Sequence, residues 1–206
     1  MSRAASHRSK PLGRSFYARE TEVVARELLG KILVSTIDNR RCEGRIVETE
    51  AYLGPHDPAS HAAERIGKTR RNASMFLQAG TAYVYRIYGM HWCLNAVTKE
   101  VDFPAAVLIR AVEPLRGLDV MRERRWPGAQ PGADRYLASG PAKLADAFAI
   151  DGALDGHDLT QPPLSILAGT DVTDDDVITS PRIGITRAAD WPLRFHVRGS
   201  MWVSRK

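Results

Sequence analysis

The chain has 206 residues, 44% of them hydrophobic and 26% charged, a composition typical of a soluble globular domain. It contains no apolar run of membrane-spanning length and no signal-peptide core, which argues against a membrane partner. We therefore expect the protein in the cytoplasm of a prokaryote, near the nucleoid, or in the nucleus of a eukaryote. Two cysteines without metal-type spacing exclude a four-cysteine centre, and we predict neither a metal nor another cofactor.

Basic residues outnumber acidic ones, 29 to 24, which gives a net charge of +5 and a pI of about 9.4. A surplus of this size is compatible with a polyanionic partner but does not require one. Residues 1–14 hold four arginines or lysines and no acid, and we expect them to form a disordered basic arm. Residues 15–206 show no repeat and no domain boundary, so we predict a single domain and a monomer.

Apolar periodicity, caps and turn residues predict elements along the whole chain. In chain order they are a helix over 21–30, strands over 31–37 and 42–53, strands within 81–98 and over 105–112, helices over 117–125 and 139–150, and strands within 182–187 and 193–203. Thr21 and Ser139 are the expected caps of the first and last helix. Several strands joined by short turns, with few helices, predict an α+β fold around a mostly antiparallel sheet.

The segment 44–54, GRIVETEAYLG, predicts a strand with an unusual polar face. Because strand side chains alternate, Glu48, Glu50 and Tyr52 point to the face opposite to the apolar Val47. One interpretation of that face is a solvated surface, the ordinary place for carboxylates. The other is a catalytic carboxylate beside a ring that holds a flat substrate.

The segment 82–92, AYVYRIYGMHW, predicts a hairpin that turns at Gly89, with Tyr88 and Met90 at its tip. Large apolar side chains seldom stay in water without a partner. One physical use for them is as a wedge pushed between base pairs from the minor groove of DNA.

Basic side chains extend this interpretation toward the C-terminus. Arg194, His196 and Arg198 share one strand face, which is either solvated or in contact with phosphates. Lys143, in the first turn of the last predicted helix, is also placed to hold a phosphate.

The sequence contains no nucleophile elbow, P-loop or dinucleotide-binding glycine pattern, so the two glutamates remain the best candidates for chemistry. A single glutamate that activates water suits a leaving group that departs easily, such as an alkylated, cationic purine on deoxyribose. Two alternatives stay open. One is a nucleic-acid-binding module without catalysis, and the other is a small-molecule glycoside or nucleoside hydrolase that uses Glu48 and Glu50.

Five motifs occur in order from about residue 15 to the C-terminus: GRIVETEAYLGPHDPASH (44–61), MFLQAGTAYVYRIYGMHWCLN (75–95), LIRAVEP (108–114), SGPAKL (139–144) and RFHVRGSMWVS (194–204). Together they resemble the alkyladenine (3-methyladenine) DNA glycosylases, the single-domain purine-excising type that lacks a helix-hairpin-helix. The resemblance implies a base-flipping repair enzyme whose partner is double-stranded DNA with damaged purines, of the 3-methyladenine, 7-methylguanine, ethenoadenine and hypoxanthine class.

Such an enzyme hydrolyses the N-glycosidic bond and leaves an abasic site for base excision repair. We expect no strand cleavage, because no lysine occupies an obvious place for imine formation. The expected fold is one compact domain around a curved, open-barrel-like sheet with flanking helices and a protruding hairpin.

The resemblance also assigns the residues of a water-activating site by motif position. Glu50 is similar to the general base that activates the attacking water, whose further contacts are Arg110 and the backbone carbonyl of Val197. The role of Glu48 does not follow beyond polar or structural support.

The remaining assignments concern the flipped base and the DNA. The side chains similar to those that sandwich or border the base are Tyr52, His61, Tyr85, Asn95 and Leu108, with Asn95 crowding the amino group of normal guanine. The residues expected to contact DNA are Tyr88, which fills the gap in the stack, Met90, His91, Arg71 and Lys143. Arg70 stands where proline is expected, and His91 where an aromatic ring is common, and both departures put substrate range in doubt.

Overall fold

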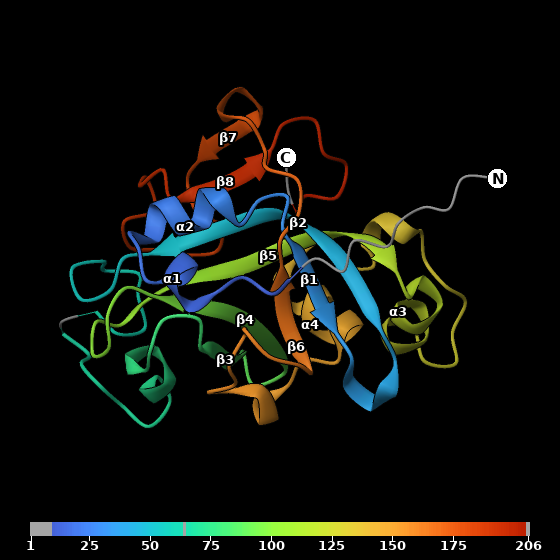
Figure 1. The fold of residues 1–206 in the computed structure, drawn as a ribbon, viewed down its shortest axis with the longest axis horizontal. Coiled ribbons are helices and arrows are strands. Elements are labelled where there is room, and N and C mark those ends of the chain that lie inside the picture. The colour runs from blue at the N-terminus through green and yellow to red at the C-terminus, as the bar shows by residue number, and fades with distance from the viewer. Residues whose placement is uncertain (1–9, 64, 205–206) are drawn as a thin grey trace.

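The computed structural model describes residues 10–63 and 65–204, and within these ranges the chain forms four α-helices and eight strands (Figure 1). The helices are α1 (Arg14–Tyr17), α2 (Thr21–Glu27), α3 (Leu118–Arg125) and α4 (Pro141–Phe148). The strands are β1 (Ile32–Ser35), β2 (Cys42–Tyr52), β3 (Ala82–Ile87), β4 (His91–Thr98), β5 (Ala105–Arg116), β6 (Leu164–Leu167), β7 (Val177–Ser180) and β8 (Arg194–Val197).

The described strands all pair antiparallel in one sheet that does not close on itself (Figure 1). Their order is β3-β4-β5-β2-β1-β6, and β8 pairs with both β2 and β7. The long strand β2 is bonded along both edges, to β5 on one side and to β1 and then β8 on the other. Its register against β5 shifts on either side of Glu48, and such bulges bend a strand and re-aim its side chains. The predicted single α+β domain around an antiparallel sheet is confirmed, with β2 near its middle.

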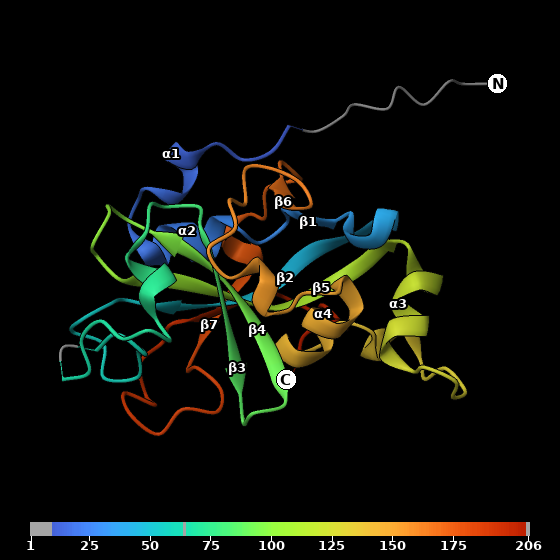
Figure 2. The ribbon, with the colours of Figure 1, turned by 90° about the horizontal axis from the view of Figure 1, so that it is seen from below.

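Two helices pack on this sheet and supply apolar side chains to the core (Figures 1 and 2). α2 packs on β2 and β5 with Val24 and Leu28 fully buried. α4 packs on β4 and β5 with Leu144 and Phe148 fully buried. Both pairs have the four-residue spacing of one helix face, and burying each side chain contributes about 1.5–3 kcal/mol.

The hairpin of β3 and β4 projects from the sheet, as predicted (Figure 2). Ile87 pairs with His91, so its loop consists of residues 88–90. Tyr88 and Gly89 both have positive φ, 52° and 69°, a conformation that glycine adopts freely and tyrosine rarely. Tyr88 is 81% exposed and Met90 68% exposed, so two large apolar side chains stand in solvent at the tip.

Several local expectations differ from the structure. The N-caps of α2 and α4 are Glu20 and Gly140, and the hydroxyl of Thr21 is bonded to that of Thr98 (2.9 Å) instead of to the helix end. The segment 182–187, predicted as a strand, is a loop, and its Ile183 amide donates to the Glu50 side chain on β2. The sequence pattern does not predict the short helix α1 or the strands β6 and β7.

Of the predicted basic arm, residues 1–9 lie outside the described residues. Residues 10–14 run beside β6, where Pro11 bridges to Leu167 and the Leu12 amide donates to the Ile166 carbonyl (2.8 Å). Arg14 forms an ion pair with Asp158 (2.7 Å). The packed chain thus begins before residue 15, because the edge of β6 offers partners that local composition does not reveal.

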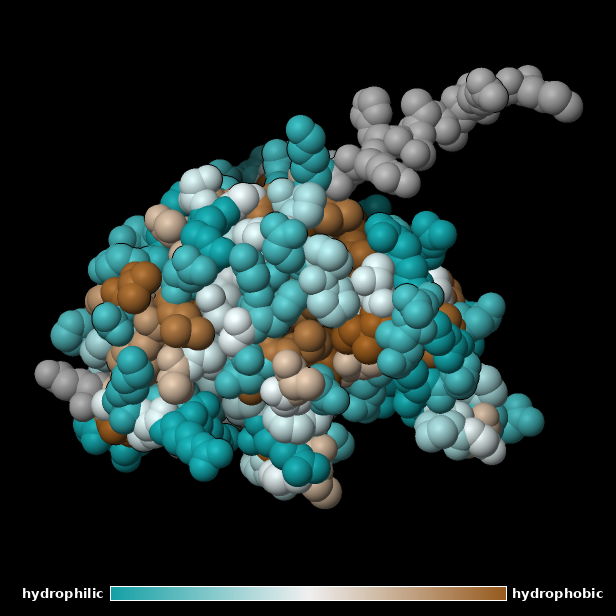
Figure 3. Space-filling model, turned by 60° about the horizontal axis from the view of Figure 1, so that its bottom comes forward, coloured by the Kyte–Doolittle hydropathy of each residue, from teal (hydrophilic) through white to brown (hydrophobic). Residues whose placement is uncertain are grey.

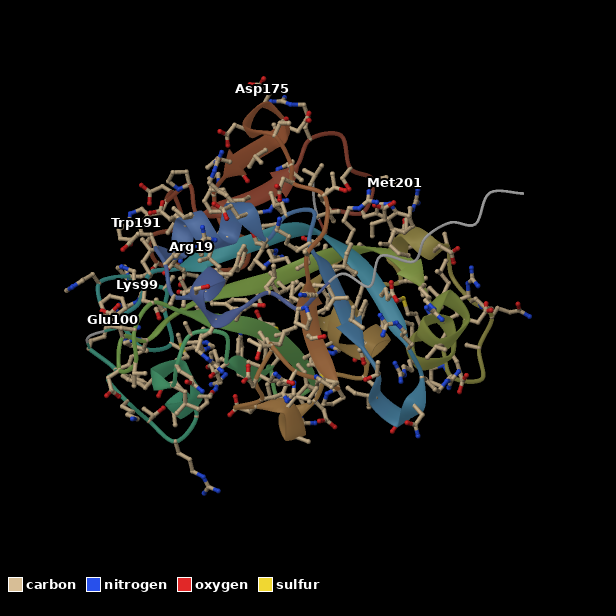
Figure 4. The ribbon with its side chains drawn as sticks, in the orientation of Figure 1. Arg19, Lys99, Glu100, Asp175, Trp191 and Met201 are labelled. Atoms are coloured by element: carbon tan, nitrogen blue, oxygen red, sulfur yellow. The ribbon has the colours of Figure 1, made fainter. Side chains whose placement is uncertain are left out.

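The surface of the described residues carries both charged turns and apolar residues. On the face shown in Figure 3, apolar residues are visible near the centre and at the left, among hydrophilic ones. Arg19, Lys99 and Glu100 lie together at one end of the molecule (Figure 4), where Lys99 pairs with Glu20 (2.8 Å) and ties the β4–β5 turn to the start of α2. In the described part of the chain, no helix has both the length and the apolar character to cross a membrane.

Candidate active site

A cavity of about 140 Å³ lies between the loop after β2, the strands β3, β4 and β5, the start of α4 and the loop between β7 and β8. A row of directly opposed residues crosses the sheet beside it: Tyr83 on β3, Asn95 on β4, Leu108 on β5 and Glu50 on β2. Opposed residues point to the same face of a sheet, so strand register alone brings these side chains together. Residues two positions along the same strands complete much of the lining.

Four rings line the cavity: Tyr52, His61, Tyr83 and Tyr85. The His61 ring meets Tyr85 edge to face, with centroids 4.4 Å apart, and lies 6.1 Å from the Tyr83 ring. Tyr83 and Tyr85 are stacked at 5.2 Å with an interplanar angle of 26°. Aromatic walls with a few polar groups between them are typical of a site for a flat heterocycle.

Burial keeps these rings uncharged at neutral pH. It raises the pKa of Tyr52, Tyr83 and Tyr85 above the ordinary value of 10.0, so all three remain phenols. Burial, followed by the charge of Arg71, lowers the pKa of His61 below 6.5. His61 therefore offers one donor and one acceptor nitrogen, and its Nδ1 is bonded to the Tyr83 hydroxyl (2.8 Å), a group that can donate or accept.

The carboxylate of Glu50 is fully buried, and three residues that line the cavity are bonded to it. The Tyr52 hydroxyl donates to Oε2 (3.0 Å), and the Ile183 amide donates to Oε1 (2.7 Å). Nη1 of Arg110 lies 3.2 Å from the same Oε1. Glu50 itself does not line the cavity; these contacts fix its carboxylate directly behind the wall formed by Tyr52, Arg110 and Ile183.

Glu48, two residues earlier on β2, is equally buried and is bonded within the scaffold. Its Oε1 accepts from Arg110 Nε (3.2 Å), Arg194 Nε (2.7 Å) and the Ser204 hydroxyl (2.9 Å), and its Oε2 accepts from the Ser204 amide (2.6 Å). Burial alone would raise the pKa of Glu48, but Arg110, the Ser204 amide and Arg194 together outweigh burial and hold the pKa below 4.5. The interpretation of this strand face as a solvated surface is wrong, because neither glutamate is exposed.

Arg110 on β5 links the two carboxylates and lines the cavity. Burial opposes its charge, but Glu50 and then Glu48 outweigh burial and raise the pKa of Arg110 above its ordinary value. The site therefore holds a permanent positive charge beside Glu50, in a geometry fixed by two buried partners.

Asn95 and Leu108 lie side by side on neighbouring strands, and both are buried and line the cavity. The Asn95 side-chain amide donates to the Tyr83 carbonyl (3.0 Å), which fixes the orientation of the side chain. The two side chains form a rigid part of the cavity wall.

Tyr88, Met90 and His91 are all exposed at the hairpin tip, outside the cavity. Ile87, the residue before the tip, lines the cavity, so the exposed side chains of the tip begin where the cavity wall ends.

The two basic residues assigned to DNA contact do not line the cavity but lie near residues that do. Arg71 is exposed, donates to the Arg86 carbonyl on the hairpin (3.0 Å) and lies over the Tyr85 ring at 5.7 Å from its centroid. Lys143 stands in the first turn of α4, two residues after Pro141, which lines the cavity.

Other predicted residues are not brought to this site. Val197 pairs with Val177 on β7 and does not line the cavity, and its carbonyl accepts from the Ser200 amide (3.3 Å). Arg194 is buried against Glu48, which excludes it from an exposed phosphate-binding face. Arg198 donates to the Asp175 carbonyl (2.9 Å), and Asp175 lies in the turn that directly precedes β7 (Figure 4).

The structure adds the residues Ile183, Gly184 and Ile185, which the sequence did not indicate as part of the site. They form the wall contributed by the β7–β8 loop, and the Ile183 amide reaches the Glu50 carboxylate. Their apolar alternation was interpreted as a strand, and no local signal placed them beside β2. Within residues 10–63 and 65–204, no group of three or more His, Cys, Asp or Glu residues is arranged to hold a metal ion.

A cavity walled by aromatic rings, a buried carboxylate at its edge and an exposed aromatic hairpin beside it define an enzyme that acts on a base of a nucleic acid. The profile of the methylpurine-DNA glycosylase (MPG) family matches residues 15–201. The chain belongs to this family.

Two relatives show how far the similarity extends. A putative 3-methyladenine DNA glycosylase of Carboxydothermus hydrogenoformans is 46% identical over 95% of this chain and 99% of its own length. The DNA-3-methyladenine glycosylase of Homo sapiens is 43% identical over 94% of this chain and 67% of its own length. The resemblance stated from the motifs is therefore confirmed, and the protein is a monofunctional DNA glycosylase of DNA repair, a hydrolase of the N-glycosidic bond.

Proposed function

We propose that the enzyme flips alkylated or deaminated purines, of the 3-methyladenine, 7-methylguanine, ethenoadenine and hypoxanthine class, out of duplex DNA and removes them with a water that Glu50 activates. The observation that carries this proposal is the position of the Glu50 carboxylate, which is buried yet bonded to Tyr52, Arg110 and Ile183 of the cavity wall. A purine stacked on Tyr52 has its glycosidic bond beside that carboxylate.

In this reaction Glu50 acts as a general base. The water oxygen bonds to C1′ of the sugar while the bond from C1′ to the purine nitrogen breaks, the purine leaves with the bonding electron pair, and Glu50 accepts the water proton. The positive charge that develops on the sugar is stabilised by the same carboxylate. Arg110, 3.2 Å from Glu50 Oε1, holds the carboxylate and the water in place.

The flipped base lies between Tyr52 on one side and the His61–Tyr85 pair on the other. Extrusion costs a few kcal/mol of lost pairing and stacking, less for a damaged base, and aromatic stacking worth about 1–3 kcal/mol per base offsets part of it. Cationic purines gain further because the faces of the rings are electron-rich. Asn95 and Leu108 set the space for purine substituents, and Asn95 crowds the exocyclic amino group of normal guanine.

Outside the cavity, Tyr88 fills the gap that the extruded base leaves, with Met90 and His91 beside it at the hairpin tip. Arg71 and Lys143 contact the phosphates of the strand that enters the site. The enzyme acts as a monomer on double-stranded DNA, in the nucleoid region of a prokaryote or in a eukaryotic nucleus, without a membrane partner.

The alternatives account for less of the structure. A small-molecule hydrolase with paired carboxylates would need Glu48 at the substrate, but both of its oxygens accept from Arg110, Arg194 or Ser204. A module that only binds DNA gives no reason for a buried carboxylate bonded to the cavity wall.

The test is release of free base from duplexes that each carry one lesion, with the wild type, Glu50→Gln and Glu43→Gln compared. Glu43 is on the same strand, is half-buried, pairs with Arg41 and Arg116 and does not line the cavity, so its variant is a matched control. We expect Glu50→Gln to lower release by about 10²–10⁴-fold while binding of damaged duplex persists. Tight binding without release by the wild type from any lesion would favour the binding module.

A further inference from the structure

An ion pair next to the cavity has no part in the reaction described above. Arg182 and Asp57 have fully buried side chains, and the Arg182 guanidinium donates from both terminal nitrogens to the two Asp57 oxygens, with Nη2–Oδ1 at 2.8 Å. Neither residue lines the cavity, yet each is at the start of a segment that does. Burying two charges is costly, so a pair of this kind marks a place where geometry is held closely.

Asp57 fixes the loop that follows β2. Its Oδ2 accepts from the Leu53 amide (3.1 Å), and its Oδ1 accepts from the Ala59 amide (3.0 Å). These bonds close the turn that carries the chain from Tyr52 to His61, two of the rings that line the cavity.

Arg182 also contacts the end of β2, next to the Glu50 carboxylate. Its Nη1 also donates to the Ala51 carbonyl (3.0 Å), and its guanidinium carbon lies 4.7 Å from the centroid of the Tyr52 ring. The next residue in the chain is Ile183, whose amide donates to Glu50. One guanidinium thus touches the ring proposed to stack on the base and fixes the backbone that donates to the proposed general base.

We propose that Arg182 and Asp57 are positioning residues, which together hold the Tyr52 ring and the Glu50 carboxylate at the spacing that hydrolysis requires. This proposal rests on the proposed function of Glu50 and Tyr52. The pair joins the loop after β2 to the loop between β7 and β8, two walls of the cavity that are about 125 residues apart in sequence. Loss of the pair lets those walls shift relative to each other while the sheet itself stays intact.

The chemistry of arginine explains why the position is sensitive. Its planar guanidinium bonds to Asp57 through a fork and stacks on a ring at the same time, whereas a lysine ammonium is a point charge that does neither. Arg182→Lys therefore keeps the charge balance of the pair but loses the geometry. Misplacement of reacting groups by about 1 Å costs roughly 10²-fold in rate.

The experiment measures single-turnover base release and duplex affinity for Arg182→Lys, with Arg122→Lys as the control. Arg122, on α3, makes a similar two-nitrogen contact (2.9 and 2.7 Å) to Asp134 in the turn that follows this helix, and neither residue lines the cavity. We expect Arg182→Lys to lower the rate by about 10–100-fold with the affinity for undamaged duplex unchanged. Arg122→Lys should leave both unchanged. Equal rates for Arg182→Lys and the wild type would overturn the proposal.

A second variant and a double-mutant cycle separate positioning from general loss of stability. Asp57→Asn keeps the acceptor for one loop amide and removes the charge, and it should lower the rate in the same way even if Arg182→Lys fails to fold. In the Tyr52→Phe background, Arg182→Lys should lower the rate by a markedly smaller factor than in the wild type. The reason is that Tyr52→Phe has already removed the hydroxyl that donates to Glu50, a contact that Arg182 is proposed to position. Additive losses would indicate a purely structural role and overturn the proposal. Absence of release by the wild type itself would instead refute the proposed function.

Discussion

Replacement of Glu48 by glutamine tests whether the buried network beneath the cavity is held by that one carboxylate. The substitution keeps the shape of the side chain but removes the negative charge that faces Arg110 and Arg194. It also leaves the amide and hydroxyl of Ser204 with a poorer acceptor. Two buried guanidinium groups then lack a counter-charge at this point.

The expected loss follows from that environment. Breaking a buried ion pair by removing one partner costs about 3–5 kcal/mol. Because glutamine keeps one oxygen acceptor, we expect Glu48→Gln to lower the free energy of unfolding by about 3 kcal/mol, the low end of this range. For a chain of this length each kcal/mol lowers the melting temperature by about 2–4 °C, so we expect a decrease of roughly 6–12 °C. Glu43→Gln, which removes a half-buried charge from the same strand, should cost about 0–1 kcal/mol.

The assay is urea unfolding of the wild type, Glu48→Gln and Glu43→Gln, repeated across a pH series. Because the folded protein holds the pKa of Glu48 below 4.5, its contribution is fully present above that pH and disappears as pH falls through the lower, folded value. The difference between wild type and Glu48→Gln should therefore be largest near neutral pH and shrink in acid. A difference below about 1 kcal/mol at pH 7, or one that grows in acid, would refute the reasoning.

Four further predictions concern the cavity and its surroundings. Asn95→Ser should raise the removal of unmodified guanine by about tenfold or more, measured as free guanine released from undamaged duplex, because a clash in a pocket is worth about 1–3 kcal/mol; an unchanged rate would remove the steric role. The ring of His61, followed by NMR, should titrate below pH 6.5, and Arg71→Gln should move its midpoint upward because a repelling positive charge is gone; a downward shift would contradict this. Duplex affinity should fall steeply with added salt, and Arg71→Ala should reduce the slope of log affinity against log salt by about one; an unchanged slope would exclude a phosphate contact. Tyr88→Ala should weaken binding of damaged duplex with little effect on the melting temperature, since the side chain is exposed.

The features that were predicted correctly from the sequence are local ones, set by residues close together in the chain. The alternation in 44–54 correctly placed Glu48 and Glu50 on one strand, and the turn at Gly89 correctly placed Tyr88 at a hairpin tip. The same alternation could not decide between solvent and a buried site, because that depends on Arg110, more than fifty residues away.

The failures are failures of long-range placement. The segment from Ile183 to Ile185 has the pattern of a strand, but its amide hydrogen bond goes to the Glu50 side chain. Val197 stands in a motif of the family, yet it is the last residue of β8, past the residues that pair with β2, and does not line the cavity. Arg194 looked like a surface cation, and only the pairing of β8 with β2 shows that it faces Glu48.

The bonding of β2 along both edges has a consequence for how the enzyme moves. Amides of a strand between two bonded neighbours exchange with solvent only when the whole domain opens, whereas exposed loop tips open on their own. Hydrogen exchange should therefore divide the molecule in two: Glu50 belongs to the last part to unfold, and the hairpin tip at Tyr88 to the first. The hairpin tip that we propose to contact the duplex is then free to fluctuate, while the carboxylate that we propose as the general base stays in one conformation.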